Sequence, residues 1–130
     1  MKKQLIYIGA GSNLGDRAEN LKMACQLLPP AVNILRTSPV YQTEPWGYKE
    51  QDAFYNLVWE AETTLPPESL LSYLKDIEKR IGRVKNFRYG PRSIDLDILL
   101  YGELAYSSER LTIPHPQMSS RLFVLRPLSD

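Results

Sequence analysis

The chain has 130 residues, of which 16 are basic and 15 acidic, giving a formal net charge of +1. This length supports one domain with a buried core, and the balanced charge excludes a global electrostatic pull toward nucleic acid or membranes. The single cysteine, Cys25, excludes an intramolecular disulfide and a CxxC metal site. No apolar run approaches about 18 residues and no signal peptide precedes Leu5, so we expect a soluble, cytoplasmic protein.

Residues 5–8 are a short apolar run typical of a buried strand. A glycine-containing loop is expected over residues 9–17, with a structural role, because its glycine spacing matches neither the dinucleotide fingerprint nor a Walker loop. Asp16 followed by Glu19 resembles a capping box, and it predicts a helix that ends at the two prolines of residues 29–30.

Residues 32–41 alternate as a second strand, in which Pro39 indicates a bulge or a sheet edge. Proline and glycine then mark a loop over residues 43–48. Trp46 lies in this loop, and an exposed tryptophan is costly unless something covers it. It is either part of a ligand site or a lid that packs on the domain's own core.

Residues 53–64 predict a third strand that is apolar on both faces. One face is made of Tyr55, Leu57, Trp59 and Ala61. Asn56 lies on the other face, and a carboxamide within an apolar strand must find partners for its donors and its acceptor. Asn56 is therefore either a structural bridge or a residue that reads the edge of a ligand.

A second helix is predicted from the prolines at residues 66–67 to Gly82, because apolar residues recur at i, i+4, i+7 and i+11. Lys75 and Glu78 lie off this apolar stripe. By their position alone, we expect both side chains to be solvated.

Residues 94–101 predict a strand that carries two carboxylates on one face. Strand alternation places Asp95 and Asp97 one pleat apart, at about 6 to 7 Å. Two aspartates this close repel each other unless a cation or hydrogen-bond donors lie between them. The alternative is an amphipathic edge strand whose polar face is exposed to solvent. Against it, the same face is expected to continue into Leu99 and Tyr101, which are not typical of a solvated face.

The segment just before this strand is basic, with no acidic residue between its charges. Its members are Lys79, Arg80, Arg83, Lys85, Arg88 and Arg92. A carboxylate pair suited to metal therefore lies beside a loop suited to phosphate.

The end of the chain predicts short extended segments. Gly102 and Glu103 resemble a hairpin turn into residues 104–106. Residues 110–116 are extended by their prolines and contain the only histidine, His115, and residues 123–125 form a last apolar run. The predicted core order is β-α-β-β-α-β, an α+β, ferredoxin-like fold in which helices pack on an antiparallel sheet.

Five motifs occur in an order and spacing that closely resemble the 6-hydroxymethyl-7,8-dihydropterin pyrophosphokinase family of folate biosynthesis. They are Gly11-Ser12-Asn13-Leu14, Thr43-Glu44-Pro45-Trp46-Gly47, Phe54-Tyr55-Asn56, Arg88-Tyr89-Gly90-Pro91-Arg92-Ser93-Ile94-Asp95-Leu96-Asp97-Ile98-Leu99 and Pro114-His115-Pro116. The resemblance covers nearly the whole chain, and the fourth motif is the most specific. It implies one domain over residues 1–130 that lacks the family's segment beyond Leu128.

The resemblance also implies an activity and its ligands. The family transfers the terminal pyrophosphate of ATP onto the hydroxymethyl oxygen of the pterin, releasing AMP, with two magnesium ions. ATP and the pterin would be the partners, without nucleic acid or membrane, and an association with neighbouring folate-pathway enzymes is compatible with the family.

The implied site residues fall into three overlapping groups. Catalysis is assigned to Arg88, Arg92, Asp95 and Asp97, of which the two aspartates hold the metal. ATP binding is assigned to Lys75, Glu78, Arg83, Arg88, Arg92, Ile98, Arg110, Thr112, His115 and Arg121. Pterin binding is assigned to Thr43, Glu44, Pro45, Trp46, Phe54, Asn56, Tyr89, Asp95 and Phe123. Lys75 departs from the family, where glutamine is frequent, and Tyr89 stands where tryptophan is common.

An RNA-recognition-type module that binds single-stranded nucleic acid is the alternative, because it shares the same element order and stacks bases on sheet aromatics. Tyr7 on the first strand and Phe54 and Tyr55 on the third could form such a platform. Against it, the third strand lacks the basic-glycine-aromatic pattern, and two aspartates in the sheet would repel a phosphate backbone without metal.

Overall fold

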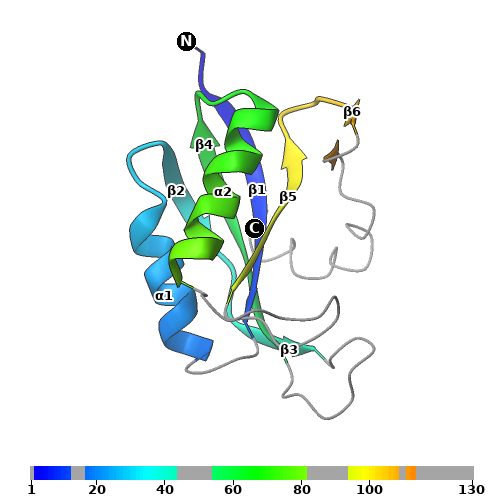
Figure 1. Cartoon of the computed structure of the whole chain (residues 1–130). Helices are drawn as coiled ribbons and strands as arrows, with labels where there is room; N and C mark the ends of the chain where they lie inside the picture. Colours follow the sequence, from blue (N-terminus) through cyan, green and yellow to red (C-terminus); the bar gives the residue numbers. More distant parts are fainter. Residues whose placement is uncertain (1, 13–16, 44–53, 82–93, 109–110, 114–130) are drawn as a thin grey trace.

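The computed structural model describes residues 2–12, 17–43, 54–81, 94–108 and 111–113. Its elements are β1 (Gln4–Ser12), α1 (Arg17–Leu27), β2 (Val32–Thr37), β3 (Tyr41–Thr43), β4 (Phe54–Thr63), α2 (Pro67–Ile81), β5 (Asp95–Tyr101), β6 (Tyr106–Ser107) and β7 (Thr112–Ile113). Figure 1 shows both helices lying on one side of the sheet. No helix within the described ranges is long and apolar enough to span a membrane.

The main sheet is antiparallel and has the strand order β2-β4-β1-β5, with β3 paired to the other end of β4. This order, with α1 and α2 as the crossovers, is that of a ferredoxin-like sheet. The predicted α+β fold is therefore confirmed. Strand β1 lies between β4 and β5 and pairs with both along its length.

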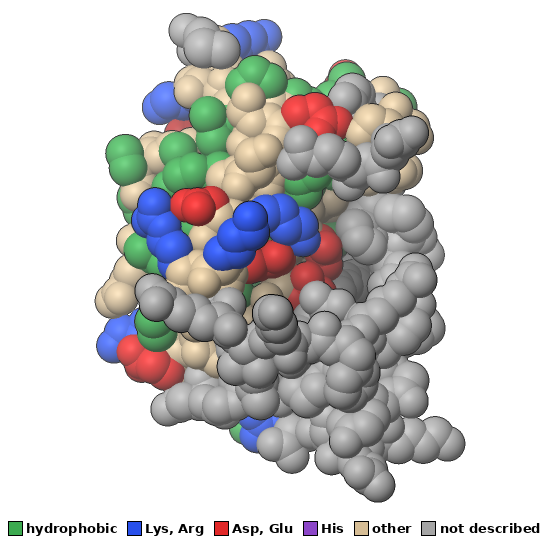
Figure 2. All heavy atoms as spheres, in the orientation of Figure 1, with side chains coloured by type: hydrophobic (Ala, Val, Ile, Leu, Met, Phe, Trp, Pro, Cys, Tyr) green, Lys and Arg blue, Asp and Glu red, His purple; other side chains and the backbone are tan. Residues whose placement is uncertain are grey.

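The main core lies between the sheet and the two helices. From β1, Ile6, Ile8 and Ala10 are fully buried on this side, in the same core cluster as Leu74 and Ile77 of α2. A smaller apolar cluster of Val58 and Leu99, with Tyr7 and Tyr41 packed against it, occupies the opposite face. The exposed charged side chains of α2 include Asp76, Lys79 and Arg80. Figure 2 shows basic and acidic groups beside one another on this side of the molecule.

The glycine-rich stretch predicted as a loop is instead partly strand, since β1 continues to Ser12. Gly9 and Gly11 pair with Val58 and Asn56 of β4 on one side and with the aspartates of β5 on the other. Ladder bonds to two neighbours satisfy the backbone of a central strand, and this outweighs the low strand propensity of glycine.

The predicted strand over residues 32–41 is broken between β2 and β3. The amide of Ser38 donates to the carbonyl of Val58 (2.9 Å), and the hydroxyl of Ser38 accepts from the amide of Val58 (2.8 Å). The side chain thus replaces a ladder bond just before Pro39, which has no amide proton to donate. The bulge or edge expected at Pro39 is here a break between two strands that pair with the same neighbour.

The aspartate strand β5 contains an irregularity that changes its alternation. Tyr7 pairs with Leu100 and Ile8 with Ile98, so Leu99 is an extra residue. Leu99 shares the aspartate face as predicted, but Tyr101 does not, because the extra residue turns it to the main core. There its hydroxyl donates to the carbonyl of Leu65 (2.7 Å).

The turn after β5 also differs from the prediction. Gly102 adopts a positive φ of 52° and its amide donates to the carbonyl of Leu5 (2.6 Å). However, the following strand β6 pairs with β7 and forms a separate two-stranded ladder, not a hairpin with β5. The apolar run at residues 123–125 lies outside the described residues.

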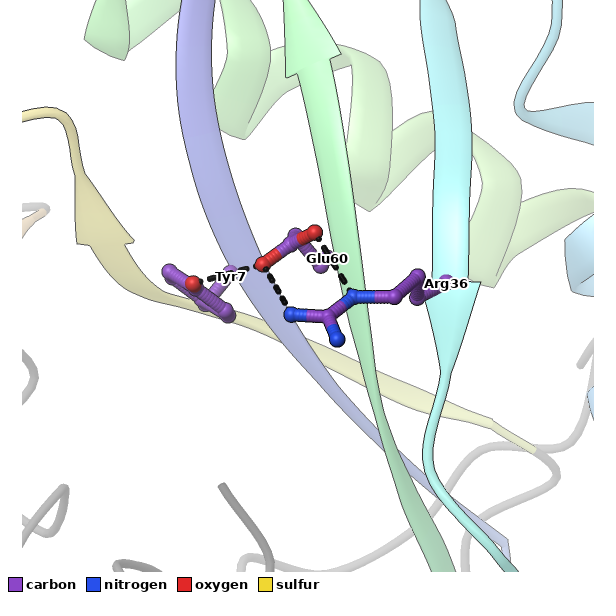
Figure 3. A network of polar contacts seen from close by, with 3 residues as sticks. All are labelled: Tyr7, Arg36 and Glu60. Atoms are coloured by element: carbon purple, nitrogen blue, oxygen red, sulfur yellow. Dashed lines mark hydrogen bonds and ion pairs between the residues drawn. The ribbon is translucent and has the colours of Figure 1, made fainter. Parts of the chain in front are cut away.

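A polar network crosses the sheet on the face away from the helices (Figure 3). Arg36 forms a two-pronged ion pair with Glu60, each N···O distance being 3.0 Å, and Tyr7 donates to the same carboxylate at 2.7 Å. The bonds from Arg36 and then from Tyr7 hold the pKa of Glu60 below its ordinary value. Burial and the adjacent carboxylate raise the pKa of Tyr7. Three strands are thereby joined through side chains.

Truncating Leu74 to alanine is expected to cost about 2–5 kcal/mol of unfolding free energy, because a fully buried side chain leaves a cavity. Urea denaturation measures this loss. The matched change Leu104→Ala, at a side chain that is 39% exposed, should stay within about 0.5 kcal/mol. Equal losses in the two variants would contradict the described core.

Replacing Arg36 with methionine should lower stability in a pH-dependent way. A carboxyl group whose pKa is lowered on folding stabilises the protein above its ordinary pKa of 4.5, and this stabilisation is lost as the pH falls through the folded pKa. The stability gap between wild type and Arg36→Met should therefore be widest near neutral pH and narrow in acid.

Urea denaturation at several pH values measures this gap. The control Arg80→Met breaks an exposed ion pair with Asp76 and should change stability little at any pH. A gap for Arg36→Met that is constant with pH would contradict the role of Glu60.

Candidate active site

The two aspartates of β5 lie on the face of the sheet away from the helices. Asp95 pairs with Gly11 and Asp97 with Gly9 on β1. The register thus confirms that both carboxylates project to one side of the strand, and both residues are half-buried. The face that carries them continues onto the smaller apolar cluster through Leu99.

Asn56 lies on the same face, two strands from Asp95. Gly11 separates them, since it pairs with Asn56 on one side and with Asp95 on the other. With strands about 4.8 Å apart, the backbones of Asn56 and Asp95 lie about 10 Å apart. Asn56 is 4% exposed. Because Gly9 and Gly11 have no side chains, β1 contributes only backbone between the polar groups of β4 and β5.

Glu78 reaches the aspartate strand from the helix side. Its Oε2 accepts a hydrogen bond from the backbone amide of Leu96 (2.7 Å), and the ammonium of Lys75 lies 3.2 Å from the same oxygen. The Glu78 side chain is only 18% exposed, so the expectation that it is solvated was wrong. Lys75, at 44%, is partly exposed as expected.

The electrostatic environment of Glu78 follows from this placement. Burial raises its pKa above the ordinary value, and the charge of Asp95 acts in the same direction. Lys75 and the Leu96 amide act in the opposite direction. Burial therefore disfavours the charged form of Glu78 at this position near the aspartates, whereas Lys75 and the Leu96 amide favour it.

The chemistry of Asp95 and Asp97 fits magnesium. Mg²⁺ prefers oxygen ligands and is usually bound through one or two carboxylates, with waters and substrate phosphates as the other ligands. Within the described part of the chain, no group of three or more His, Cys, Asp or Glu side chains could hold a metal ion. Asp95 and Asp97 match the carboxylate part of such a site, and their role as ligands stays a prediction.

The remaining predicted residues within the described ranges are spread around this face. Thr43 and Phe54 pair with each other across β3 and β4, next to the pair formed by Tyr41 and Asn56. Thr112 is exposed on β7, a strand that lies against β5. Ile98 is 1% exposed in the main core, so its side chain points away from the aspartates' face, and a nucleotide contact would use its backbone.

The other predicted site residues lie outside the described residues. They are Glu44, Pro45, Trp46, Arg83, Arg88, Tyr89, Arg92, Arg110, His115, Arg121 and Phe123.

Sequence reasoning missed two features of this region. One is the position of Gly9 and Gly11 between the polar residues, which a strand assignment for residues 9–12 would have revealed through their alternate spacing. The other is the bond from Leu96 to Glu78. No sequence signal identifies this bond, because it depends on the position of α2 relative to β5 in the folded chain.

Comparison with known proteins places the chain in a family. A model of the 7,8-dihydro-6-hydroxymethylpterin-pyrophosphokinase (HPPK) family matches residues 7–130. A Bacillus subtilis protein named 2-amino-4-hydroxy-6-hydroxymethyldihydropteridine pyrophosphokinase is 44% identical over 128 residues, which are 97% of this chain and 77% of that protein.

Some relatives are much longer. The folic acid synthesis protein fol1 of Pneumocystis carinii is 46% identical over 128 residues, covering 98% of this chain and 17% of its own length. The mitochondrial folate synthesis bifunctional protein of Pisum sativum is 44% identical over 126 residues, covering 96% of this chain and 24% of its own length. This chain thus spans less than a quarter of the length of each of these two relatives.

The family match favours the pterin pyrophosphokinase interpretation over the RNA-recognition alternative. It agrees with the ferredoxin-like sheet and with the carboxylate pair on β5. The resemblance seen in the motifs is thereby confirmed, and the chain belongs to the 7,8-dihydro-6-hydroxymethylpterin-pyrophosphokinase family.

Proposed function

We propose that this chain transfers pyrophosphate from ATP to the hydroxymethyl oxygen of 6-hydroxymethyl-7,8-dihydropterin in folate biosynthesis. The products are AMP and the pterin diphosphate. The observation that supports this most directly is the placement of Asp95 and Asp97 on one sheet face, opposite Asn56 across the glycines of β1. Family membership supplies the substrate class.

The two sides of this face suit the two substrates. On the β4 side, the carboxamide of Asn56 can both donate and accept, which matches the edge of a pterin with its own donors and acceptors. Phe54 and Phe123 are proposed to stack the flat ring. Thr43, Glu44, Pro45, Trp46 and Tyr89 complete the proposed pterin residues.

On the β5 side, carboxylates suit a magnesium-bound polyphosphate. We assign Mg²⁺ to Asp95 and Asp97; when bound, the metal neutralises charge on the phosphate oxygens. The residues proposed to contact the nucleotide are Lys75, Arg83, Arg88, Arg92, Ile98, Arg110, Thr112, His115 and Arg121. Of these, Arg88 and Arg92 are proposed to lie nearest the transferred group, where guanidinium groups would stabilise developing charge.

The proposed reaction depends mainly on how the two substrates are positioned. The hydroxymethyl oxygen forms a bond to the β-phosphorus as the bond from that phosphorus to the bridging oxygen of AMP breaks. Holding the two substrates in line supplies much of the rate enhancement, because it converts a bimolecular step into an effectively unimolecular one. In support of this, the residues proposed for the pterin and for the metal lie on β4 and β5, on either side of β1.

The decisive experiment measures AMP release from ATP and Mg²⁺ with and without 6-hydroxymethyl-7,8-dihydropterin. We expect pterin-dependent AMP, and we expect Asp97→Asn to reduce its rate more than about a hundredfold while leaving the thermal melt unchanged. Asp76→Asn, an exposed carboxylate on α2, should keep wild-type activity. Pterin-independent AMP, or full activity of Asp97→Asn, would count against the proposal.

Asn56→Ala should weaken pterin use selectively. Losing the hydrogen bonds of the carboxamide is expected to raise the KM for the pterin by about tenfold, with little change in the KM for ATP. Steady-state kinetics at saturating second substrate measure both constants. Asn33→Ala on β2, where the residue is exposed, is the control. A parallel rise of both KM values for Asn56→Ala would show a general disturbance of the sheet instead.

A further inference from the structure

Glu78 is bonded to the backbone of the strand that carries both aspartates. Its Oε2 lies 2.7 Å from the amide nitrogen of Leu96, and Leu96 is the residue between Asp95 and Asp97. The side chain of Glu78 is 18% exposed, and Lys75 pairs with the same oxygen at 3.2 Å. The acceptor is therefore largely shielded from water and already has two partners.

The position of β5 in the sheet explains why this bond matters. Among the strands that the structure describes, β5 ends the strand order, and its pairing partner in the main sheet is β1. Alternate amides of an edge strand point away from the sheet and lack a ladder acceptor. The amide of Leu96 is one of these, and α2 supplies the acceptor that a further strand would otherwise supply.

The bonded amide belongs to the residue between the two carboxylates. The side chain of Leu96 is fully buried in the main core, whereas Asp95 and Asp97 project from the opposite face. Fixing the peptide at Leu96 restricts the backbone on both sides of it, and so restricts the rotation of the strand that would move the two aspartates.

We propose that Glu78 is a positioning residue, which fastens β5 to α2 at Leu96 and so holds Asp95 and Asp97 in their working direction. This differs from the direct nucleotide contact that the family resemblance implies for Glu78. The role in catalysis rests on the proposed function, whereas the anchor itself is independent of it.

Amide hydrogen exchange tests the anchor without any activity. In the wild type, the Leu96 amide should exchange at least about a hundredfold more slowly than an unstructured amide. Glu78→Gln keeps an oxygen acceptor and should keep this protection, whereas Glu78→Leu should accelerate exchange by about tenfold or more. An unprotected Leu96 amide in the wild type would overturn the proposal, even if Glu78→Leu fails to fold.

Kinetics separate positioning from nucleotide contact. For pterin-dependent AMP release, Glu78→Gln should retain kcat within about threefold, and Glu78→Leu should lose about tenfold or more in kcat with little change in the KM for ATP. Asp76→Leu is the matched control, since its carboxylate on the same helix pairs only with exposed Arg80 in the described contacts. A raised KM for ATP in both Glu78 variants would overturn the positioning role.

The two measurements also distinguish failure of this proposal from failure of the proposed function. A wild type without pterin-dependent AMP would refute the function, and the catalytic part of the role would fall with it. Exchange at Leu96 would still decide whether Glu78 holds β5. An active wild type with an unprotected Leu96 amide would refute the anchor alone.

Discussion

The pairing of β1 on both sides is the constraint on which the rest of the structure depends. Its ladder with β4 and its ladder with β5 bring together residues from distant parts of the chain, so that Asn56 and Asp95 flank Gly11 on its two sides. The same strand presents Ile6, Ile8 and Ala10 to the helices. One strand thus sets the core on one face and the spacing of the candidate site on the other.

Glycine at alternate positions of β1 links the fold to the site. A strand interior is a poor place for glycine unless something approaches the backbone closely. Here Gly9 and Gly11 occupy the face that carries the aspartates, while Ala10 between them is buried in the core. The two positions of low strand propensity lie on the face of the proposed site, and the two flanking ladders compensate for the loss of strand stability.

The arrangement of the candidate residues within the described ranges could be predicted in part from the sequence, because it depends on local alternation. The period of two from Ile94 to Ile98 was enough to place both aspartates on one face, and the position of Asn56 in an apolar strand marked it as unusual. Tyr101 was misplaced because one extra residue reverses the alternation, which no local pattern reveals. Glu78 was misread because its burial depends on the packing of α2 against β5.

The hydrogen bonds of Tyr101 and Leu96 connect the two ends of β5 to the two ends of the α2 segment. Tyr101 at the end of β5 bonds to Leu65, just before α2 begins, and Leu96 near the start of β5 bonds to Glu78 in the last turn of the helix. A helix of 15 residues and a strand of seven both span about 22 Å. The length of a helix is fixed by its backbone hydrogen bonds, so a shift of β5 by one residue would break both of these bonds at once. The helix thereby helps to fix the register of the strand.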